Sequence, residues 1–438
     1  MRFLTLAFIF ALSFMYAQVS HVAVRLNESK WTLYVDDEPY YIRGGGGTVN
    51  LEQLKAAGGN TIRTWGIEQA QEILDQAQKL GLKVMLGYWL QHERHGFDYN
   101  DTIAVQNQYN QVRDAVLKYK DHPALLMWGL GNEYELAYSN TAVWRAVNDI
   151  AKMVHELDPH HPTSTVTAGT SLEKLKFVNK ELTAIDIYGI NTYGDIENVQ
   201  ETLDSGGYSG PYMITEWGPN GHWESPKTPW GMSLEQTSTE KAMCYLNRYN
   251  KYISANKTQC IGSFAFLWGQ KQEYTHTWYG LFTEKGKSTE AIDALTFCWK
   301  GVYPDNRTPQ IDSIRIDGEK DIRYGVFLSR SKHQITVYAH DVEKDKISYL
   351  WELYPESTDL KMGGDAEIKP KTIEGRIFQK NSASIRLKTP LKEGKYRLFV
   401  SVTDESKVAS ANIPFQVIAG KPKAIAIKSA ELNSFNND

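Results

Sequence analysis

The stretches Trp128-Gly-Leu-Gly-Asn-Glu133 and Met213-Ile-Thr-Glu216-Trp-Gly218 decide how this chain folds. Each one ends an apolar run typical of a buried strand and places a glutamate where that strand ends. The two glutamates are 83 residues apart (216 − 133), so only the fold can bring them together. A parallel barrel does this, because the carboxyl ends of its strands share one rim.

Eight apolar runs of this kind alternate with helix-like segments between about Val22 and Gly301. In chain order they are 40–43, 61–65, 83–89, 124–130, 163–167, 185–190, 211–215 and 261–268. Several are continuously apolar, as expected of strands buried on both faces of a parallel sheet. Eight strand–helix units predict an α/β fold, a (β/α)8 TIM barrel over residues 18–302. A doubly wound sheet is the alternative, but the glycines at 44–47 lack the G-x-G-x-x-G spacing and no helix opens directly on them.

The hydrophobic pattern of the sequence changes at Pro304-Asp-Asn-Arg-Thr-Pro309, a turn-rich hinge after which helix periodicity stops. Runs of alternating polar and apolar residues follow, which predict a small all-β, Ig-like or PKD-like sandwich over residues 303–420. We expect this domain to be a spacer rather than a carbohydrate-binding module, since no cluster of exposed aromatic residues stands out. A polar tail occupies 421–438.

The first 17 residues have the pattern of a cleaved signal peptide. Arg2 supplies a positive charge, residues 3–16 are almost wholly apolar, and Ala17 is a small residue at a suitable cleavage point. The apolar run is shorter than the ~20 residues of a membrane span. We therefore expect an exported protein that is periplasmic, cell-surface or extracellular, with no membrane span.

The net charge bears on the class of binding partner, and the cysteine count limits the number of possible disulfides. A net charge of −4 gives no reason to expect nucleic acid or an anionic membrane as a partner. The three cysteines, Cys244, Cys260 and Cys298, allow at most one internal disulfide. Unpaired, buried thiols are the equally open alternative.

The two strand-end glutamates suit complementary roles in cleaving a glycosidic bond. An acid catalyst needs a raised pKa, and the apolar strand end beside Trp128 can provide this for Glu133 by desolvation. Asn132 can bond a sugar hydroxyl next to the reacting carbon. Glu216 can be the ionised nucleophile of a double displacement. For each glutamate, the alternative is a structural ion pair inside the barrel.

With both motifs in place, residues 22–301 resemble the catalytic barrel of clan A retaining glycoside hydrolases, and most closely the family 2 barrel. The resemblance implies that Asn132-Glu133 carries the acid/base and that Glu216 is the nucleophile. It also implies that Arg63 steadies the nucleophile, that Tyr193 hydrogen-bonds it, and that Trp268 forms an aromatic floor under the sugar.

Further side chains near predicted strand ends are candidates for substrate binding. Trp65, Trp89 and Trp223 can stack against sugar faces. His92, in the loop His92-Glu-Arg-His95, can donate to a sugar hydroxyl. A metal site using His92 and His95, with Asp98 near, is a weak alternative, because two histidines in one loop have no distant partner ligand. We expect neither a metal nor another cofactor.

The resemblance does not carry over a particular sugar. Family 2 members usually have sandwich domains before the barrel, whereas here the second expected domain follows it. The expected substrate is therefore an oligo- or polysaccharide, with a beta-glucan as one candidate. A transglycosylase using the same residues and a non-catalytic glycan-binding barrel remain alternatives.

Overall fold

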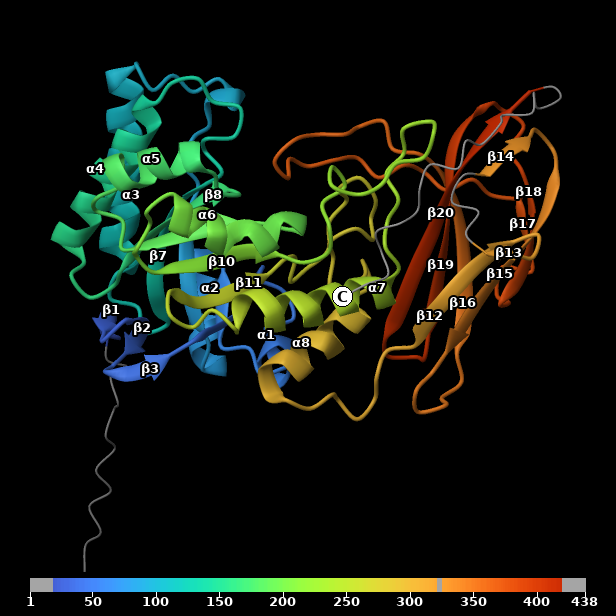
Figure 1. Ribbon diagram of the computed structural model, residues 1–438, viewed down its shortest axis with the longest axis horizontal. Helices are drawn as coiled ribbons and strands as arrows, with labels where there is room; N and C mark the ends of the chain where they lie inside the picture. Colours follow the sequence, from blue (N-terminus) through green and yellow to red (C-terminus); the bar gives the residue numbers. More distant parts are fainter. Residues whose placement is uncertain (1–18, 321–324, 420–438) are drawn as a thin grey trace, which may run out of the picture.

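The computed structural model describes residues 19–320 and 325–419. The predicted signal peptide and polar tail lie outside these residues. Two regions lie side by side, a barrel formed by the first part of the chain and a β domain formed by the last (Figure 1).

The first region is a closed parallel barrel with strand order β10-β11-β4-β5-β6-β7-β8-β9. Its strands are β4 (Ile42–Gly46), β5 (Thr61–Arg63), β6 (Lys83–Tyr88), β7 (Leu125–Asn132), β8 (Thr163–Ala168), β9 (Ile187–Asn191), β10 (Tyr212–Trp217) and β11 (Cys260–Ala265). The helices between and after them are α1 (Leu51–Ala56), α2 (Ala70–Leu80), α3 (Thr102–Tyr119), α4 (Ala142–Leu157), α5 (Leu172–Glu181), α6 (Val199–Ser205), α7 (Ser238–Arg248) and α8 (Glu290–Lys300). The predicted TIM barrel is confirmed, and each of the eight predicted runs overlaps one of its strands.

Amphipathic helices cover the outside of the barrel. In α4, the buried residues Val143, Val147, Ile150 and Val154 recur every three or four positions, so they form one face against the strands. Short connections end these helices cleanly. Gly81, with φ of +65°, takes the left-handed position that closes α2 just before β6 begins.

A three-stranded sheet closes the amino-terminal end of the barrel. It comprises β1 (Val22–Asn27), β2 (Lys30–Val35) and β3 (Glu38–Tyr40). Val22 donates its backbone N–H to the carbonyl of His160, just before β8. Leu33 joins an apolar cluster with inward-facing barrel residues such as Met213. The sequence did not predict this sheet as a separate element.

The second region is built from two β-sheets around its own core. Its strands are β12 (Gln310–Ile316), β13 (Glu319–Lys320), β14 (Gly325–Leu328), β15 (Lys332–His340), β16 (Ser348–Pro355), β17 (Ile377–Phe378), β18 (Ser384–Lys388), β19 (Gly394–Thr403) and β20 (Val408–Ile418). Sheet order is β13-β12-β15-β18-β17 and β14-β20-β19-β16. Trp351, Ile335 and Val400 lie in the core. A two-sheet, all-β region is thus confirmed, while its likeness to Ig-like domains stays a prediction.

The two regions share a polar, well-connected interface. The buried Arg397 pairs with Glu356 in the β domain and donates to the carbonyl of Ser233 in the barrel, at 2.9 Å. Asn412 donates to Glu235 of the barrel at 2.7 Å. These hydrogen bonds hold the β domain in one orientation relative to the barrel. A domain that only separated the barrel from another partner would not need them.

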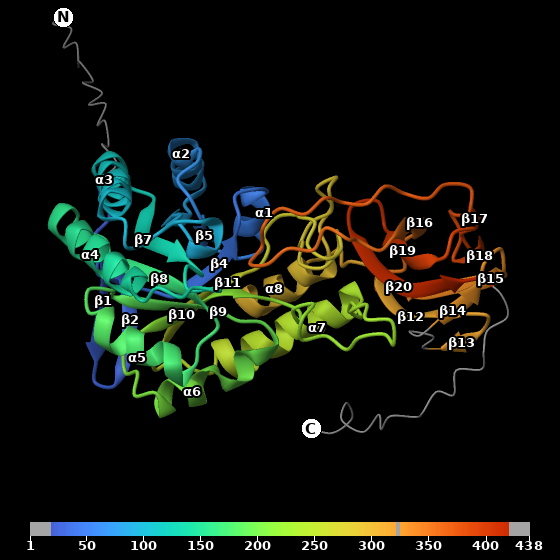
Figure 2. The same cartoon turned by 90° about the horizontal axis from the view of Figure 1, so that it is seen from above.

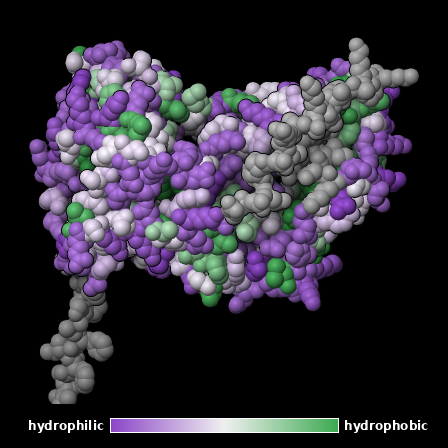
Figure 3. Space-filling model, viewed as in Figure 1, coloured by the Kyte–Doolittle hydropathy of each residue, from purple (hydrophilic) through white to green (hydrophobic). Residues whose placement is uncertain are grey.

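Two surface properties bear on partners. None of the helices in the described part of the chain is long and apolar enough to cross a membrane. Outside the grey atoms, the face in Figure 3 is largely hydrophilic, and its apolar residues form small, scattered groups. This face therefore carries no broad apolar patch of the kind that marks a large docking surface.

Candidate active site

The carboxyl-terminal rim of the barrel gathers polar side chains from four strands. Arg63 ends β5, Asn132 ends β7 and Asn191 ends β9. Glu133 directly follows β7, and Glu216 is the fifth residue of β10. These residues come from distant parts of the sequence but form a single hydrogen-bonded group.

Arg63 is the centre of this group. Its Nη1 donates to Glu216 Oε1 at 3.1 Å and to the Thr215 carbonyl at 2.8 Å, and Nη2 donates to Asn132 Oδ1 at 2.6 Å. Both Arg63 and Glu216 are buried. A buried carboxylate is costly unless it is paired, so the planar guanidinium both neutralises and orients it.

Two further donors fix the Glu216 carboxylate. The Trp65 indole N–H reaches Oε1 at 2.8 Å, and the Tyr193 hydroxyl donates to Oε2 at 3.0 Å. Each carboxylate oxygen is therefore held by at least one donor. This preorganisation suits a group that must stay ionised and aimed in one direction.

Glu133 has the opposite electrostatic environment. Its side chain is half-buried, and burial, together with the nearby charge of Glu216, raises the pKa of Glu133 to about 8. A hydrogen bond from Asn191 Nδ2 to Oε1, 2.8 Å long, opposes that rise. The backbone of Glu133 has a φ of +50°, which is rare for a residue other than glycine. Glu133 thus holds a proton at neutral pH while Glu216 is held by donors, a pairing typical of acid and nucleophile.

Asn191 links the two glutamates and was missed by sequence reasoning. Its Nδ2 also donates to Asn132 Oδ1 at 3.1 Å, while its Oδ1 accepts from the Thr215 hydroxyl at 2.8 Å and from Arg63 at 3.3 Å. The available signal was a single polar residue at the end of the apolar run 187–191.

Comparison with known proteins identifies the family of the barrel. Residues 49–309 match the family described as "Glycosyl hydrolases family 2, TIM barrel domain". The chain belongs to glycosyl hydrolases family 2. It is 25% identical over 302 residues to a beta-glucuronidase from Paenibacillus borealis, covering 60% of this chain and 48% of that protein. It is also 25% identical over 146 residues to mannan endo-1,4-beta-mannosidase F from Aspergillus clavatus, covering 29% of this chain and 34% of that protein.

Among solved structures, the Faecalibacterium prausnitzii beta-glucuronidase aligns with a TM-score of 0.51 and 18% identity, covering 64% of this chain and 52% of that one. A likeness at this identity shows the fold alone. The chain spans about half the length, or less, of the curated relatives that it matches.

One predicted aromatic residue of this family 2 barrel does not reach the rim. Trp268 is 0% exposed and packs against Trp299 and Phe282 behind the barrel wall, so its assignment as the sugar floor is wrong. Phe266, two residues earlier, lies in the site instead. Its ring centroid is 5.9 Å from that of Trp65 and 6.0 Å from that of Tyr193.

The loop after β6 also differs from expectation. His92 is fully buried, so the prediction that it binds a sugar hydroxyl is wrong. Its ring stacks on Trp89, 4.6 Å away and nearly parallel, and its Nδ1 accepts a bond from Arg94. Burial lowers the pKa of His92 to about 4, so the ring is neutral. The half-buried Trp89 keeps its predicted place at the rim, now with His92 behind it.

Trp223, in the loop between β10 and α7, is the most open of the predicted aromatic residues. It is 54% exposed, and its ring meets that of Tyr193 edge-to-face at 5.7 Å. Tyr193 also donates to Glu216, so only the Tyr193 ring separates Trp223 from this carboxylate. It therefore remains a candidate for stacking against a sugar.

Two further predictions concern possible metal ligands and the cysteines. No group of three or more His, Cys, Asp or Glu side chains within 19–320 and 325–419 could hold a metal ion. Cys244, Cys260 and Cys298 are all free thiols, so the open disulfide question resolves to unpaired cysteines.

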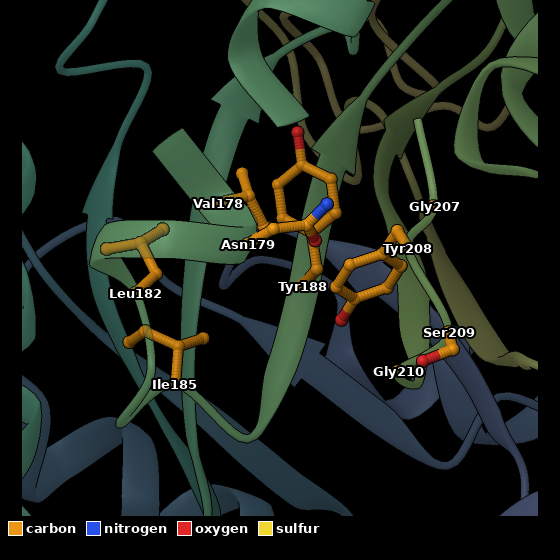
Figure 4. A pocket seen from close by; sticks show the side chains of 9 residues that line it. All are labelled: Val178, Asn179, Leu182, Ile185, Tyr188, Gly207, Tyr208, Ser209 and Gly210. Carbon is orange, nitrogen blue, oxygen red and sulfur yellow. The ribbon is translucent and has the colours of Figure 1, made fainter. Parts of the chain in front are cut away.

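A cavity of about 200 Å³ lies away from this site, outside the barrel wall (Figure 4). Tyr188 of β9, Tyr208 and residues of α5 line it. Its lining includes neither glutamate and no charged side chain. The site is therefore identified by the carboxylate pair and its donors, not by the size of a cavity.

Proposed function

We propose that this chain is an exported retaining beta-glycosidase that hydrolyses O-glycosidic bonds of an oligo- or polysaccharide. The observation that carries the proposal is the contrast between the two carboxyl groups. Glu216 is buried and held by Arg63, Trp65 and Tyr193. Glu133, whose pKa is raised, has only Asn191 as a hydrogen-bond donor among the described side chains.

The reaction proceeds by double displacement. The Glu216 carboxylate attacks the anomeric carbon while the Glu133 carboxyl gives its proton to the departing glycosidic oxygen. The glycosyl ester on Glu216 is then cleaved by water, whose proton returns to Glu133. This restores both groups to their starting states and releases the sugar with its configuration retained.

The surrounding residues assist without exchanging protons. Arg63 and Tyr193 hold Glu216 in line for attack, and Trp65 adds a third donor. Asn132, fixed by Arg63 and Asn191, offers its amide toward the substrate hydroxyl beside the anomeric carbon. Exposed Trp223 and half-buried Trp89 provide apolar surfaces for sugar rings.

The sugar is left to experiment, since one relative is named a beta-glucuronidase and another a mannan endo-beta-mannosidase. The substrate panel therefore includes aryl beta-glucoside, galactoside, mannoside and glucuronide, together with soluble beta-glucans. Export is tested separately by amino-terminal sequencing of protein from the extracellular or periplasmic fraction, which we expect to begin at Gln18.

The decisive test compares wild type with Glu216→Ala and Glu133→Ala on this panel. We expect Glu216→Ala to lower kcat by about 10⁴-fold or more. Added azide should then yield the inverted glycosyl azide from Glu216→Ala and the retained azide from Glu133→Ala. Glu68→Ala, which removes an exposed carboxylate after β5, is the control and should stay active.

Some results would contradict the proposal. Full activity in Glu216→Ala would remove the assigned nucleophile, and an inverted first product from wild type would exclude double displacement. Products formed at high acceptor concentration separate hydrolysis from transfer to a second sugar. A wild type inactive on every substrate would favour a glycan-binding barrel.

A further inference from the structure

One long connection of the β domain reaches the mouth of the barrel. Residues 356–376, between β16 and β17, form a segment that we name the strap. In both views the orange strap leaves the β domain and extends over the barrel loops (Figures 1 and 2). One of its charged groups, Asp365, is held by two residues of the loop after β6.

The contact between Asp365 and the barrel is bidentate. Arg94 Nη1 donates to Asp365 Oδ2 at 2.8 Å and Nη2 donates to Oδ1 at 3.3 Å. His95 Nε2 lies 3.1 Å from the same Oδ2. The Arg94 side chain is only 9% exposed, so this pair is screened less by water than an ordinary surface pair.

The rest of the strap is tied to the loop after β11. Lys271 Nζ donates to the Gly364 carbonyl at 3.0 Å, and the Tyr274 N–H donates to Glu367 at 2.7 Å. Because β4 and β5 lie between β11 and β6 in the barrel, the strap spans the rim above those two strands. It also packs closely there, since a Cβ on Gly363 would lie 2.9 Å from Arg94 Nη2.

From Arg94, the contacts continue toward the carboxylate pair. Its Nε–H donates to His92 Nδ1 at 3.2 Å, which leaves the proton of the neutral ring on Nε2. The strap also reaches the turn directly, because a Cβ on Gly363 would lie 2.9 Å from Leu136 Cδ2, and the Leu136 N–H donates to the Glu133 carbonyl at 3.0 Å. A continuous series of contacts thus runs from the β domain to the turn that carries the acid/base.

We propose that Asp365 is a positioning residue for the acid/base step. By anchoring the strap on Arg94, it keeps Gly363 packed against Leu136 and so fixes the turn that carries Glu133. The inference rests on the proposed glycosidase function. Without the carboxylate, Arg94 keeps its charge but no longer anchors the strap, so the strap and the turn packed against it gain alternative positions. Misplaced Glu133 would harm proton transfer more than attack by Glu216.

The first test uses leaving groups that differ in their need for a proton. Phenyl and 2,4-dinitrophenyl beta-glycosides of the sugar that wild type prefers are compared in Asp365→Ala and Asp365→Asn. We expect Asp365→Ala to lower kcat/KM, which reports the first displacement, about 10-fold for the phenyl glycoside, part of the 10²–10⁴-fold that acid catalysis supplies, and less than about twofold for the dinitrophenyl glycoside. Asp365→Asn, which keeps an acceptor for Arg94, should recover part of the loss.

Asp312→Asn is the matched control, because Asp312 pairs with a histidine, His340, in the same domain but within its own sheet. It should match wild type on both substrates. Equal losses on both substrates in Asp365→Ala would overturn the proposal and indicate that the strap binds sugar instead.

A second measurement does not depend on activity. Hydrogen exchange of peptides covering 90–97 and 130–136 is compared in wild type, Asp365→Ala and Asp312→Asn. Faster exchange of both peptides only in Asp365→Ala supports the contact series, and unchanged exchange of 130–136 overturns it. If wild type cleaves no glycoside, the proposed function fails, while exchange still decides whether the strap positions this turn.

Discussion

The two ends of the barrel use the same strands for opposite purposes. On β10, Met213 belongs to the apolar cluster closed by the β1–β3 sheet, whereas Glu216, three residues later, lies in the polar group at the other rim. On β7, Met127 likewise belongs to the apolar cluster, whereas Asn132 belongs to the polar group. Stability and chemistry are therefore separated along each strand, as is usual for this fold. Substitutions at each end should separate them experimentally.

Arg63→Met should have the largest effect, because it is the one change expected to affect both properties. It leaves Glu216 buried without its ion pair and removes donors to Thr215 and Asn132. We expect the free energy of unfolding to fall by about 3–5 kcal/mol and kcat/KM by about 10²–10³-fold. Guanidinium unfolding and steady-state kinetics measure these. Retained activity would show that Arg63 is structural only.

Leu33→Ala tests the opposite end. Leu33 is fully buried in the apolar cluster, so we expect a loss of about 2–5 kcal/mol in the free energy of unfolding with kcat/KM unchanged at 25 °C. Leu26→Ala, on the same small sheet but 53% exposed, is the control and should change stability by less than about 0.5 kcal/mol. A large fall in kcat/KM for Leu33→Ala would show that the two ends are coupled.

The eight strands and both glutamates could be predicted because the signals are local. Continuous apolar runs identify buried parallel strands, and a charged residue directly after such a run must lie at the rim. This reasoning placed Glu133 and Glu216 where strands end, and the family resemblance added Arg63. Their hydrogen-bond partners, such as Asn191, depend on neighbouring strands and could not be assigned.

The wrong and missing assignments have physical reasons. In Phe264-Ala-Phe-Leu-Trp268, aromatic residues occupy alternate positions, and no local pattern tells which one points to the rim after the strand ends at Ala265. The strap has no periodicity at all, and its role depends on contacts 271 residues apart in sequence, between Arg94 and Asp365. Such contacts are visible only in the folded chain.

Phe266→Leu and Trp268→Leu test which aromatic residue after β11 contributes to the site and which contributes to stability. Aromatic contacts are worth about 0.5–1.5 kcal/mol, so we expect Phe266→Leu to lower kcat/KM about two- to tenfold. Trp268→Leu should lower the melting temperature and leave kcat/KM unchanged, because Trp268 packs only behind the barrel wall. The reverse pattern would restore Trp268 as the sugar floor.

The smallest expected effect is a shift in the pH dependence of kcat/KM. Glu133 must be protonated to act as the acid, and its pKa is raised to about 8, so kcat/KM of wild type should fall above about pH 8. Asn191 donates to the Glu133 carboxylate and so favours its ionised form. Asn191→Ala removes this donor, which raises the pKa and moves the alkaline limb to higher pH.

The expected shift of that limb is about half to one pH unit, since a single neutral donor contributes about 0.5–1.5 kcal/mol. Asn179→Ala, which changes an exposed amide on α5, should leave the profile in place. The direction of the shift carries the argument. Movement to lower pH would mean that Asn191 favours the protonated acid, and an unmoved limb would mean that another group controls it. Only an upward shift fits an Asn191 amide whose oxygen is turned toward Thr215 and Arg63 and whose nitrogen faces Glu133.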